Sequence, residues 1–131
     1  MKQRITEAFE VKQFAFKAHE LNPEDPTILH FLGRFAFRIA GISWVERKIA
    51  ATVMAEPPKT TYEEALDYFL KADKASSSPF IRNWLWIGHT HAKLGNKAEA
   101  KEYYQKTADA QPETQSDQFE IDEAKQLLKK L

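Results

Sequence analysis

Residues 81–112 decide the fold of this chain, and they read IRNWLWIGHTHAKLGNKAEAKEYYQKTADAQP. The stretch combines two small residues, two large aromatic residues and two residues that end helices: Gly88, Ala100, Trp84, Tyr104, Gly95 and Pro112. Apolar side chains recur at helical spacing on both sides of Gly95, a residue type that favours the end of a helix. We therefore expect two antiparallel helices that cross most closely at Gly88 and Ala100, with the two aromatic side chains filling the space on either side.

This pattern resembles the tetratricopeptide repeat, a helix–turn–helix unit of about 34 residues. In that repeat the first helix carries a large residue, Leu-Gly and an aromatic residue, and the second carries Ala, an aromatic residue and a closing Pro. The sequence departs from the repeat at His91, where Tyr is preferred, and at Thr107, where Ala is preferred. The resemblance implies an all-α, tetratricopeptide-like superhelix of helical hairpins that serves as a binding scaffold and not as an enzyme.

The same pattern occurs a second time with an interruption. Residues 29–33 (LHFLG) match the first helix of a repeat, and residues 65–72 (ALDYFLKA) match the second. Gly33 and Ala65 lie 32 positions apart, whereas Gly88 and Ala100 lie 12 apart, so 20 residues are inserted in this repeat. The apolar residues of the insertion recur at helical spacing, which predicts an additional amphipathic helix.

The ends of the chain complete the expected organisation. Residues 17–23 read as the end of a second helix whose first helix is missing, so we expect a C-terminal fragment of a longer protein. An apolar stripe near the C-terminus predicts a cap helix. We expect a single domain over 1–131, with a repeat at 26–75, its inserted helix at about 42–55, a regular repeat at 79–112 and a cap helix at 116–131.

Local signals predict seven helices. Their expected ranges are 4–21, 26–40, 43–55, 61–75, 79–94, 97–110 and 117–130. Side chains that can accept hydrogen bonds from the first turn of a helix predict N-caps at Asp25, Thr60, Ser78 and Asn96. Gly41 and Gly95 stand where two of the helices should end.

Composition excludes several classes of protein. The chain has 131 residues, no cysteine, and 19 basic against 19 acidic residues. The absence of cysteine excludes disulfides and thiolate zinc sites, and zero net charge gives no basis for nucleic-acid binding. No apolar stretch approaches the roughly 20 residues of a membrane-spanning helix. We expect no transmembrane segment in this chain, no cofactor and no nucleic-acid partner.

Several short stretches together resemble the regulator of microtubule dynamics family. They are LGR at 32–34, SWVERKIAAT at 43–52, the pair Pro57-Pro58, TYEEAL at 61–66 and FLKA at 69–72. The resemblance covers about residues 8 to 131. It implies a cytoplasmic protein linked to microtubules, spindle organisation and chromosome segregation, without catalytic residues. Some relatives sit at mitochondrial or endoplasmic-reticulum surfaces, which upstream segments would mediate, and there the domain is associated with phospholipid.

Basic side chains gather on the two first helices of the repeats. The residues concerned are His30, Arg34 and Arg38 on one helix and Arg82, Trp86, His89 and Lys93 on the other, each set at a spacing of three or four. Acidic residues collect on the second helices. One interpretation is that these are ordinary solvated faces. The other is a basic concave groove for an extended acidic partner, such as the tails of tubulin, or for an anionic phospholipid headgroup.

The inserted helix leaves a second function open. It carries Trp44, Arg47 and Lys48, and it could lid an apolar cavity for phospholipid beside Phe37. A deep apolar cavity there would favour lipid, and a shallow basic groove would favour a peptide. Trp44, Trp84 and Trp86 could stack a ligand, but two of them stand at repeat-core or insertion positions, and we expect packing in the interior there, including at Trp44. His89 and His91 point in different directions on a helix, so we expect no metal site there.

Overall fold

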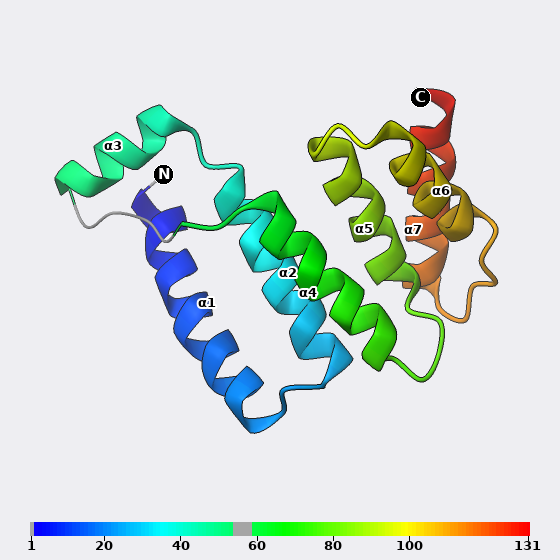
Figure 1. Cartoon of the computed structure of the whole chain (residues 1–131), viewed down its shortest axis with the longest axis horizontal. Helices are drawn as coiled ribbons and strands as arrows, with labels where there is room; N and C mark the ends of the chain where they lie inside the picture. Colours follow the sequence, from blue (N-terminus) through cyan, green and yellow to red (C-terminus); the bar gives the residue numbers. More distant parts are fainter. Residues whose placement is uncertain (1, 54–58) are drawn as a thin grey trace.

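The computed structural model describes the backbone of residues 2–53 and 59–131, and the side chains of these residues except 2–9, 11 and 53. Within these ranges the chain forms seven α-helices and no strand (Figure 1). The helices are α1 (Lys2–Leu21), α2 (Pro26–Ala40), α3 (Trp44–Val53), α4 (Tyr62–Ala75), α5 (Ile81–Lys93), α6 (Lys97–Ala108) and α7 (Gln115–Lys129). The all-α prediction is confirmed, and the predicted helices agree with the observed ones to within about two residues at most ends. The predicted Pro57-Pro58 exit lies outside the described residues.

Two of the predicted helix ends are confirmed in detail. The carboxylate of Asp25 accepts hydrogen bonds from the backbone N–H groups of Thr27 and Ile28, at 2.9 and 3.2 Å. This N-cap satisfies donors that the first turn of α2 cannot pair internally. Gly95 follows α5 with a φ of +81°, the left-handed conformation that ends helices and that glycine adopts without strain.

The predicted cap at Thr60 is displaced by one residue. Thr61 is the N-cap of α4, and its hydroxyl accepts a hydrogen bond from the Glu64 N–H at 3.1 Å. The Thr60 hydroxyl instead donates to the Ala36 carbonyl at 2.6 Å and so fixes the start of α4 against α2. A tertiary hydrogen bond therefore takes the side chain that the local pattern assigned to the cap.

The predicted cap at Ser78 is wrong, and Asn96 is the N-cap residue of α6 but makes no capping bond with its side chain. The residue before α5 is Phe80, which makes no side-chain capping bond and packs on His30 with ring centroids 5.0 Å apart. Asn96 precedes α6, but its N–H donates to the His91 carbonyl at 2.9 Å as part of the turn that ends α5. Its side chain lies 3.2 Å from His91 Nδ1 and makes no capping bond. A contact of Phe80 with α2, and the turn that ends α5 at Asn96, thus take the place of the predicted capping bonds.

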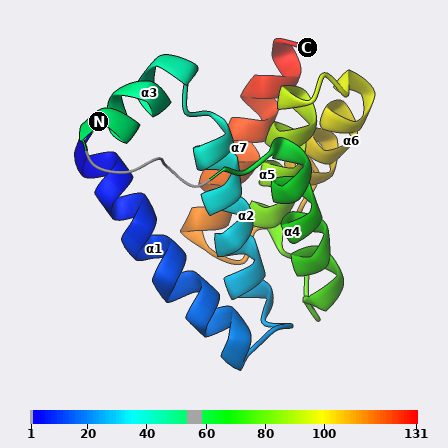
Figure 2. The same ribbon diagram turned by 60° about the vertical axis from the view of Figure 1, so that its left-hand side comes forward.

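The helices lie side by side in a row that begins with α1 and ends with α6 and α7 (Figures 1 and 2). The main neighbours are α1 with α2, α2 with α4, α4 with α5, α5 with α6, and α6 with α7. Helix α3 leaves this row at one end and projects from it (Figure 1). The pairing of α2 with α4 across the intervening α3 is compatible with one tetratricopeptide-type repeat that carries an inserted helix.

In the pair α2–α4 and in the pair α5–α6, an aromatic ring of the second helix packs on a glycine of the first. A Cβ atom added at Gly33 would lie 2.6 Å from ring carbons of Phe69, and one added at Gly88 would lie 2.6 Å from a ring carbon of Tyr104. Both rings belong to nearly or fully buried side chains. The prediction of a close approach at Gly88 is therefore correct, but the ring of Tyr104 lies directly over the glycine and not to one side of it.

We predict that Gly88→Ala destabilises the protein by about 1–2 kcal/mol, because overpacking costs about 1–3 kcal/mol and the higher helix propensity of alanine offsets up to about 1 kcal/mol. Gly41→Ala is the matched control, since its nearest neighbour would be the Tyr62 hydroxyl at 3.3 Å and its φ of −82° suits any residue. Urea unfolding of both variants measures the difference. Equal stability of Gly88→Ala and the parent chain would contradict the ring-on-glycine packing.

Candidate functional site

His30, predicted to face a partner, lies in the core between α2, α4 and α5. Its side chain is 6% exposed, and its Nδ1 lies 2.9 Å from Asn83 Oδ1. Asn83 Nδ2 donates to the Phe69 carbonyl at 2.7 Å, so Asn83 Oδ1 is the acceptor and His30 Nδ1 carries the proton. Burial, and to a lesser degree the charges of Arg34 and Arg82, lower the pKa of His30 to about 4. His30 is therefore a neutral link between three helices and not a cation of the groove.

Arg34, one turn after His30, stands at the surface of the same helix. Its guanidinium lies 4.7 Å from the centre of the Trp86 ring, within the range of a cation–π interaction. Burial first, and then the charges of Arg38 and Arg82, lower the pKa of Arg34. Its buried Nε atom has no hydrogen-bond partner in the part of the chain that the structure describes. The site thus brings like charges together around a half-buried guanidinium.

A cavity of about 280 Å³ adjoins Arg34. Four residues of the predicted groove line it, namely Arg34, Arg38, Trp86 and Lys93, together with Phe37, Gly41 and Ile42 from the α2 end, Glu46 from α3 and Tyr62 from α4. Among the residues that the structure describes, three cations therefore surround the space against one carboxylate, Glu46. We call this space the α2–α5 cavity. The structure brings these four predicted residues together from helices that are far apart in the sequence.

Aromatic rings form one wall of the α2–α5 cavity. The Phe37 ring meets the rings of Tyr62 and Trp86 edge to face, with centroids 5.2 Å apart in both pairs. Trp86 in turn meets His89 at 5.1 Å, and His89 Nδ1 lies 2.9 Å from the Tyr104 hydroxyl. Burial lowers the pKa of His89 to about 4, so this residue is a neutral part of the aromatic packing behind the cavity.

Arg82 does not line the cavity and pairs instead with the cap helix. Its Nε donates to Glu120 Oε1 at 2.6 Å, and its Nη2 donates to Ser116 Oγ at 2.7 Å. Sequence reasoning missed both residues of α7. The sequence held only part of the signal. Thr114 and Asp117 form a capping box that begins α7 before the predicted residue 117, and Ser116 and Glu120 then lie one turn apart on the same face, but this does not show that α7 approaches Arg82.

The predicted inserted helix, α3, borders the cavity only through residues near its start. Trp44, expected to pack in the interior, is 68% exposed, and Lys48 Nζ lies 4.3 Å from the centre of its ring. The packing prediction for Trp44 is therefore wrong, since a surface cation–π pair replaces the buried contact. Arg47 Nη2 donates to the Ile39 carbonyl at 3.3 Å and ties α3 to the end of α2.

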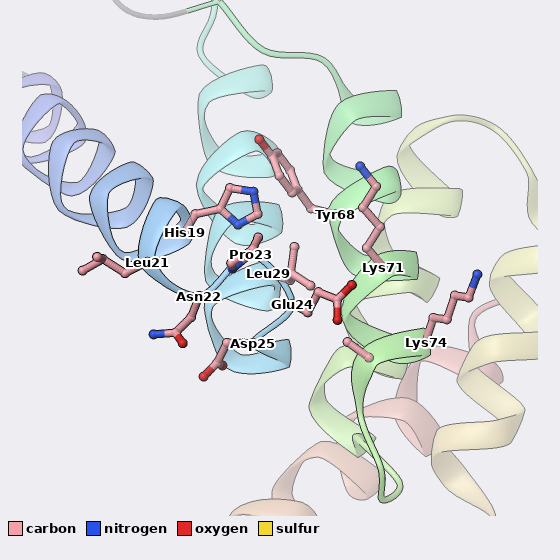
Figure 3. A pocket seen from close by; sticks show the side chains of 11 residues that line it. His19, Leu21, Asn22, Pro23, Glu24, Asp25, Leu29, Tyr68, Lys71 and Lys74 are labelled. Carbon is pink, nitrogen blue, oxygen red and sulfur yellow. The ribbon is translucent and has the colours of Figure 1, made fainter.

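A larger cavity, of about 910 Å³, lies between the end of α1, the following turn and α4, and it shares no residue with the α2–α5 cavity. Figure 3 shows His19 of α1 and Tyr68 of α4 facing one another across α2. Their ring centroids are 6.4 Å apart, and burial raises the pKa of Tyr68. No sequence pattern predicted this cavity, because it depends on the angle between α1 and α4.

Two further features of the described residues bear on the site. Within residues 2–53 and 59–131, none of the helices is by itself long and apolar enough to cross a membrane. Helix α2 and the stretch Trp44–Thr52, which meet at a bend of 92°, reach the length and composition of a membrane span only when taken together. In the same ranges no three histidine, cysteine or acidic side chains lie together as a set that could hold a metal ion.

We predict that acid destabilises the fold as pH falls from about 6.5 towards 4. The unfolded chain binds a proton at His30 in this window and the folded chain does not, so the loss reaches about 3 kcal/mol for His30 alone. Urea unfolding at several pH values measures the slope of stability against pH. We expect a shallower slope for His30→Gln than for the parent chain, and an unchanged slope for His91→Gln. A slope that His30→Gln leaves unchanged would contradict the assignment.

Comparison with known proteins identifies the family. The model of the family described as "Regulator of microtubule dynamics protein 1-3" matches residues 1–131. Regulator of microtubule dynamics protein 1 from Bos taurus is 38% identical over 129 residues, 98% of this chain and 41% of the relative. The Homo sapiens protein of that name is 38% identical over 98% of this chain and 41% of its own length, and the Caenorhabditis elegans protein is 34% identical over 98% and 57%. This chain thus spans about two fifths of the length of its mammalian relatives, and it belongs to the regulator of microtubule dynamics family.

Proposed function

We propose that this chain is a non-catalytic binding scaffold that associates with microtubules and takes an extended acidic polypeptide, such as a tail of tubulin, in the groove between α2 and α5. The observation that carries the proposal is the convergence of Arg34, Arg38 and Lys93 on one cavity that holds a single carboxylate, Glu46. The names of the relatives, regulators of microtubule dynamics, supply the microtubule as the setting.

Electrostatics favours an anionic partner at this place. Cations that converge in a concavity focus the field and raise the rate of encounter with an acidic chain. Burial first, and then the charges of Arg38 and Arg82, lower the pKa of Arg34, and a bound anion would favour its charged form. Charge and geometry thus favour the same class of ligand.

The opposite charge lies on other helices. Glu63, Glu64 and Asp67 are exposed on α4, and Glu99 and Glu102 are exposed on α6. Acidic residues outnumber basic ones on α4, whereas α6 also exposes Lys97, Lys101 and Lys106, so of these two helices only α4 carries a net negative charge. This arrangement would orient the domain on a negatively charged filament.

The cellular role that we propose follows the family. The chain would act in the cytoplasm on the cytoskeleton, in spindle organisation and chromosome segregation. Segments beyond this chain would decide whether a longer protein also resides at a mitochondrial or endoplasmic-reticulum surface.

The α2–α5 cavity favours a peptide over the alternative of a phospholipid. Its volume of about 280 Å³ lies below the roughly 300–1,000 Å³ of typical small-molecule sites, which leaves no room for two acyl chains. Helix α3 would have to lid the cavity, yet its Trp44 is exposed and Ile42 and Glu46 alone reach the cavity from that segment.

We predict that Arg38→Glu/Lys93→Glu weakens binding to microtubules at least about tenfold, because two exposed cations of the groove become anions. Co-sedimentation at low and moderate salt, with intact tubulin and with tubulin stripped of its acidic tails, measures the effect. The matched control is Lys74→Glu/Lys125→Glu, which makes the same change of charge on exposed residues outside the groove.

Loss of binding with the groove variant, with the tails removed and with salt would support the proposal. If the groove and control variants pelleted to the same extent, or if removal of the tails had no effect, the groove would not be the binding site.

We predict that Glu120→Gln strengthens binding of the same acidic partner, by roughly two- to fivefold, because Arg82 loses its internal counter-charge and joins the groove. Glu123→Gln, an equal change of charge on an exposed position of the same helix, serves as the control. Titration of a tubulin-tail peptide by fluorescence anisotropy measures both. A gain of equal size in the control would mean that net charge, and not the release of Arg82, is responsible.

A further inference from the structure

The wall of the α2–α5 cavity combines aromatic side chains with cationic ones. Phe37, Tyr62 and Trp86 present aromatic rings, packed edge to face with one another. Arg34 and Arg38 stand beside these rings on α2, and Arg34 already stacks on one of them. A tubulin tail held by charge alone would need no aromatic recess, so the recess indicates a more specific ligand.

The size of the cavity matches one aromatic side chain. A cavity of about 150 Å³ takes a benzene ring, and the volume here is about 280 Å³. A phenol or phenyl ring fits this space with room for the atoms that link it to a backbone. The edge-to-face arrangement of the walls offers an entering ring the geometry that aromatic pairs prefer, and a guanidinium stacks well on a ring face.

The charges decide which ligand enters. Aromatic walls beside a carboxylate also form cages for alkylated ammonium groups. Here, however, three cations, Arg34, Arg38 and Lys93, surround the walls against Glu46, so a cationic ligand would be repelled. The neutral ring of an acidic peptide meets no such penalty, and carboxylates beside it reach the three cations.

We propose that the α2–α5 cavity is a pocket for one aromatic side chain of an acidic peptide, with the flanking carboxylates of that peptide bound by Arg34, Arg38 and Lys93. The inference rests on the proposed function and sharpens it, since it turns a general preference for acidic chains into recognition of a sequence. The ligand class is a short segment in which a tyrosine or phenylalanine stands among glutamates or aspartates.

Three synthetic peptides with blocked ends test this pocket. They are Gly-Glu-Glu-Tyr-Glu-Glu-Gly, the same peptide with Ala for Tyr, and the same peptide with Gln for every Glu. Fluorescence anisotropy gives the affinities, and the indole N–H signal of Trp86 in a ¹⁵N-labelled sample reports contact at the wall. We expect the tyrosine peptide to bind roughly tenfold more tightly than the alanine peptide, because a ring leaves water. The Gln peptide should bind weakly, and the tyrosine peptide alone should shift the Trp86 signal strongly.

A variant that fills the pocket provides the second arm. Gly41 lines the cavity with a backbone conformation open to any residue, so Gly41→Leu should occupy the space without disturbing the fold. We expect this variant to bind the tyrosine and alanine peptides equally, at the weaker affinity. Ala98→Leu, an exposed substitution on α6, is the matched control and should keep the tenfold preference.

The outcomes separate the two proposals. If the acidic peptides bound equally well to the parent chain, the aromatic pocket would be refuted while the basic groove stood. If the tyrosine preference survived Gly41→Leu, the ring would bind elsewhere and the pocket would again be refuted. If none of the three peptides bound, both the pocket and the proposed function would fall.

Discussion

The packing of an aromatic ring on the backbone of a helix sets the arrangement of the central helices. Phe69 lies on Gly33 and Tyr104 lies on Gly88, each so close that even a methyl group on the glycine would clash. A ring in this position brings the two helix axes together and fixes their rotation, since only one face of the first helix is bare. The sides of α2 and α5 that bear Arg34 and Trp86 do not take part in this packing and line the α2–α5 cavity.

A second, polar constraint joins the two pairs. His30 donates to Asn83, and Asn83 donates to the Phe69 carbonyl, so one buried chain of hydrogen bonds connects α2, α5 and α4. Buried polar groups are costly unless they are paired, and this requirement selects one register of α2 against α5. In that register Arg34 stacks on Trp86, and the cations of two distant segments face the same cavity.

Sequence patterns predict what depends on spacing along one chain, and they miss what depends on how helices meet. The helices follow from periodicity, and the role of Gly88 follows from its place between aromatic residues. Four of the predicted groove residues do converge, but His30 and Arg82 have other partners. Spacing places His30 on the stripe of Arg34 and cannot show that Asn83 and Phe69 bury it. Likewise, the pairing of Arg82 with Glu120 requires the angle at which α7 crosses α5, which no local signal carries.

The pairing of Arg82 with Glu120 affects where positive charge remains on a chain of zero net charge. With 19 basic and 19 acidic residues, the chain as a whole attracts no particular charge, so any preference must come from where its cations gather. Glu120 neutralises one end of the basic stripe, while Arg34, Arg38 and Lys93 face a single carboxylate at the other. Attraction is therefore concentrated where the aromatic walls stand. A site that joins local charge to a recess for one ring can distinguish between acidic chains, which a uniformly basic surface cannot do.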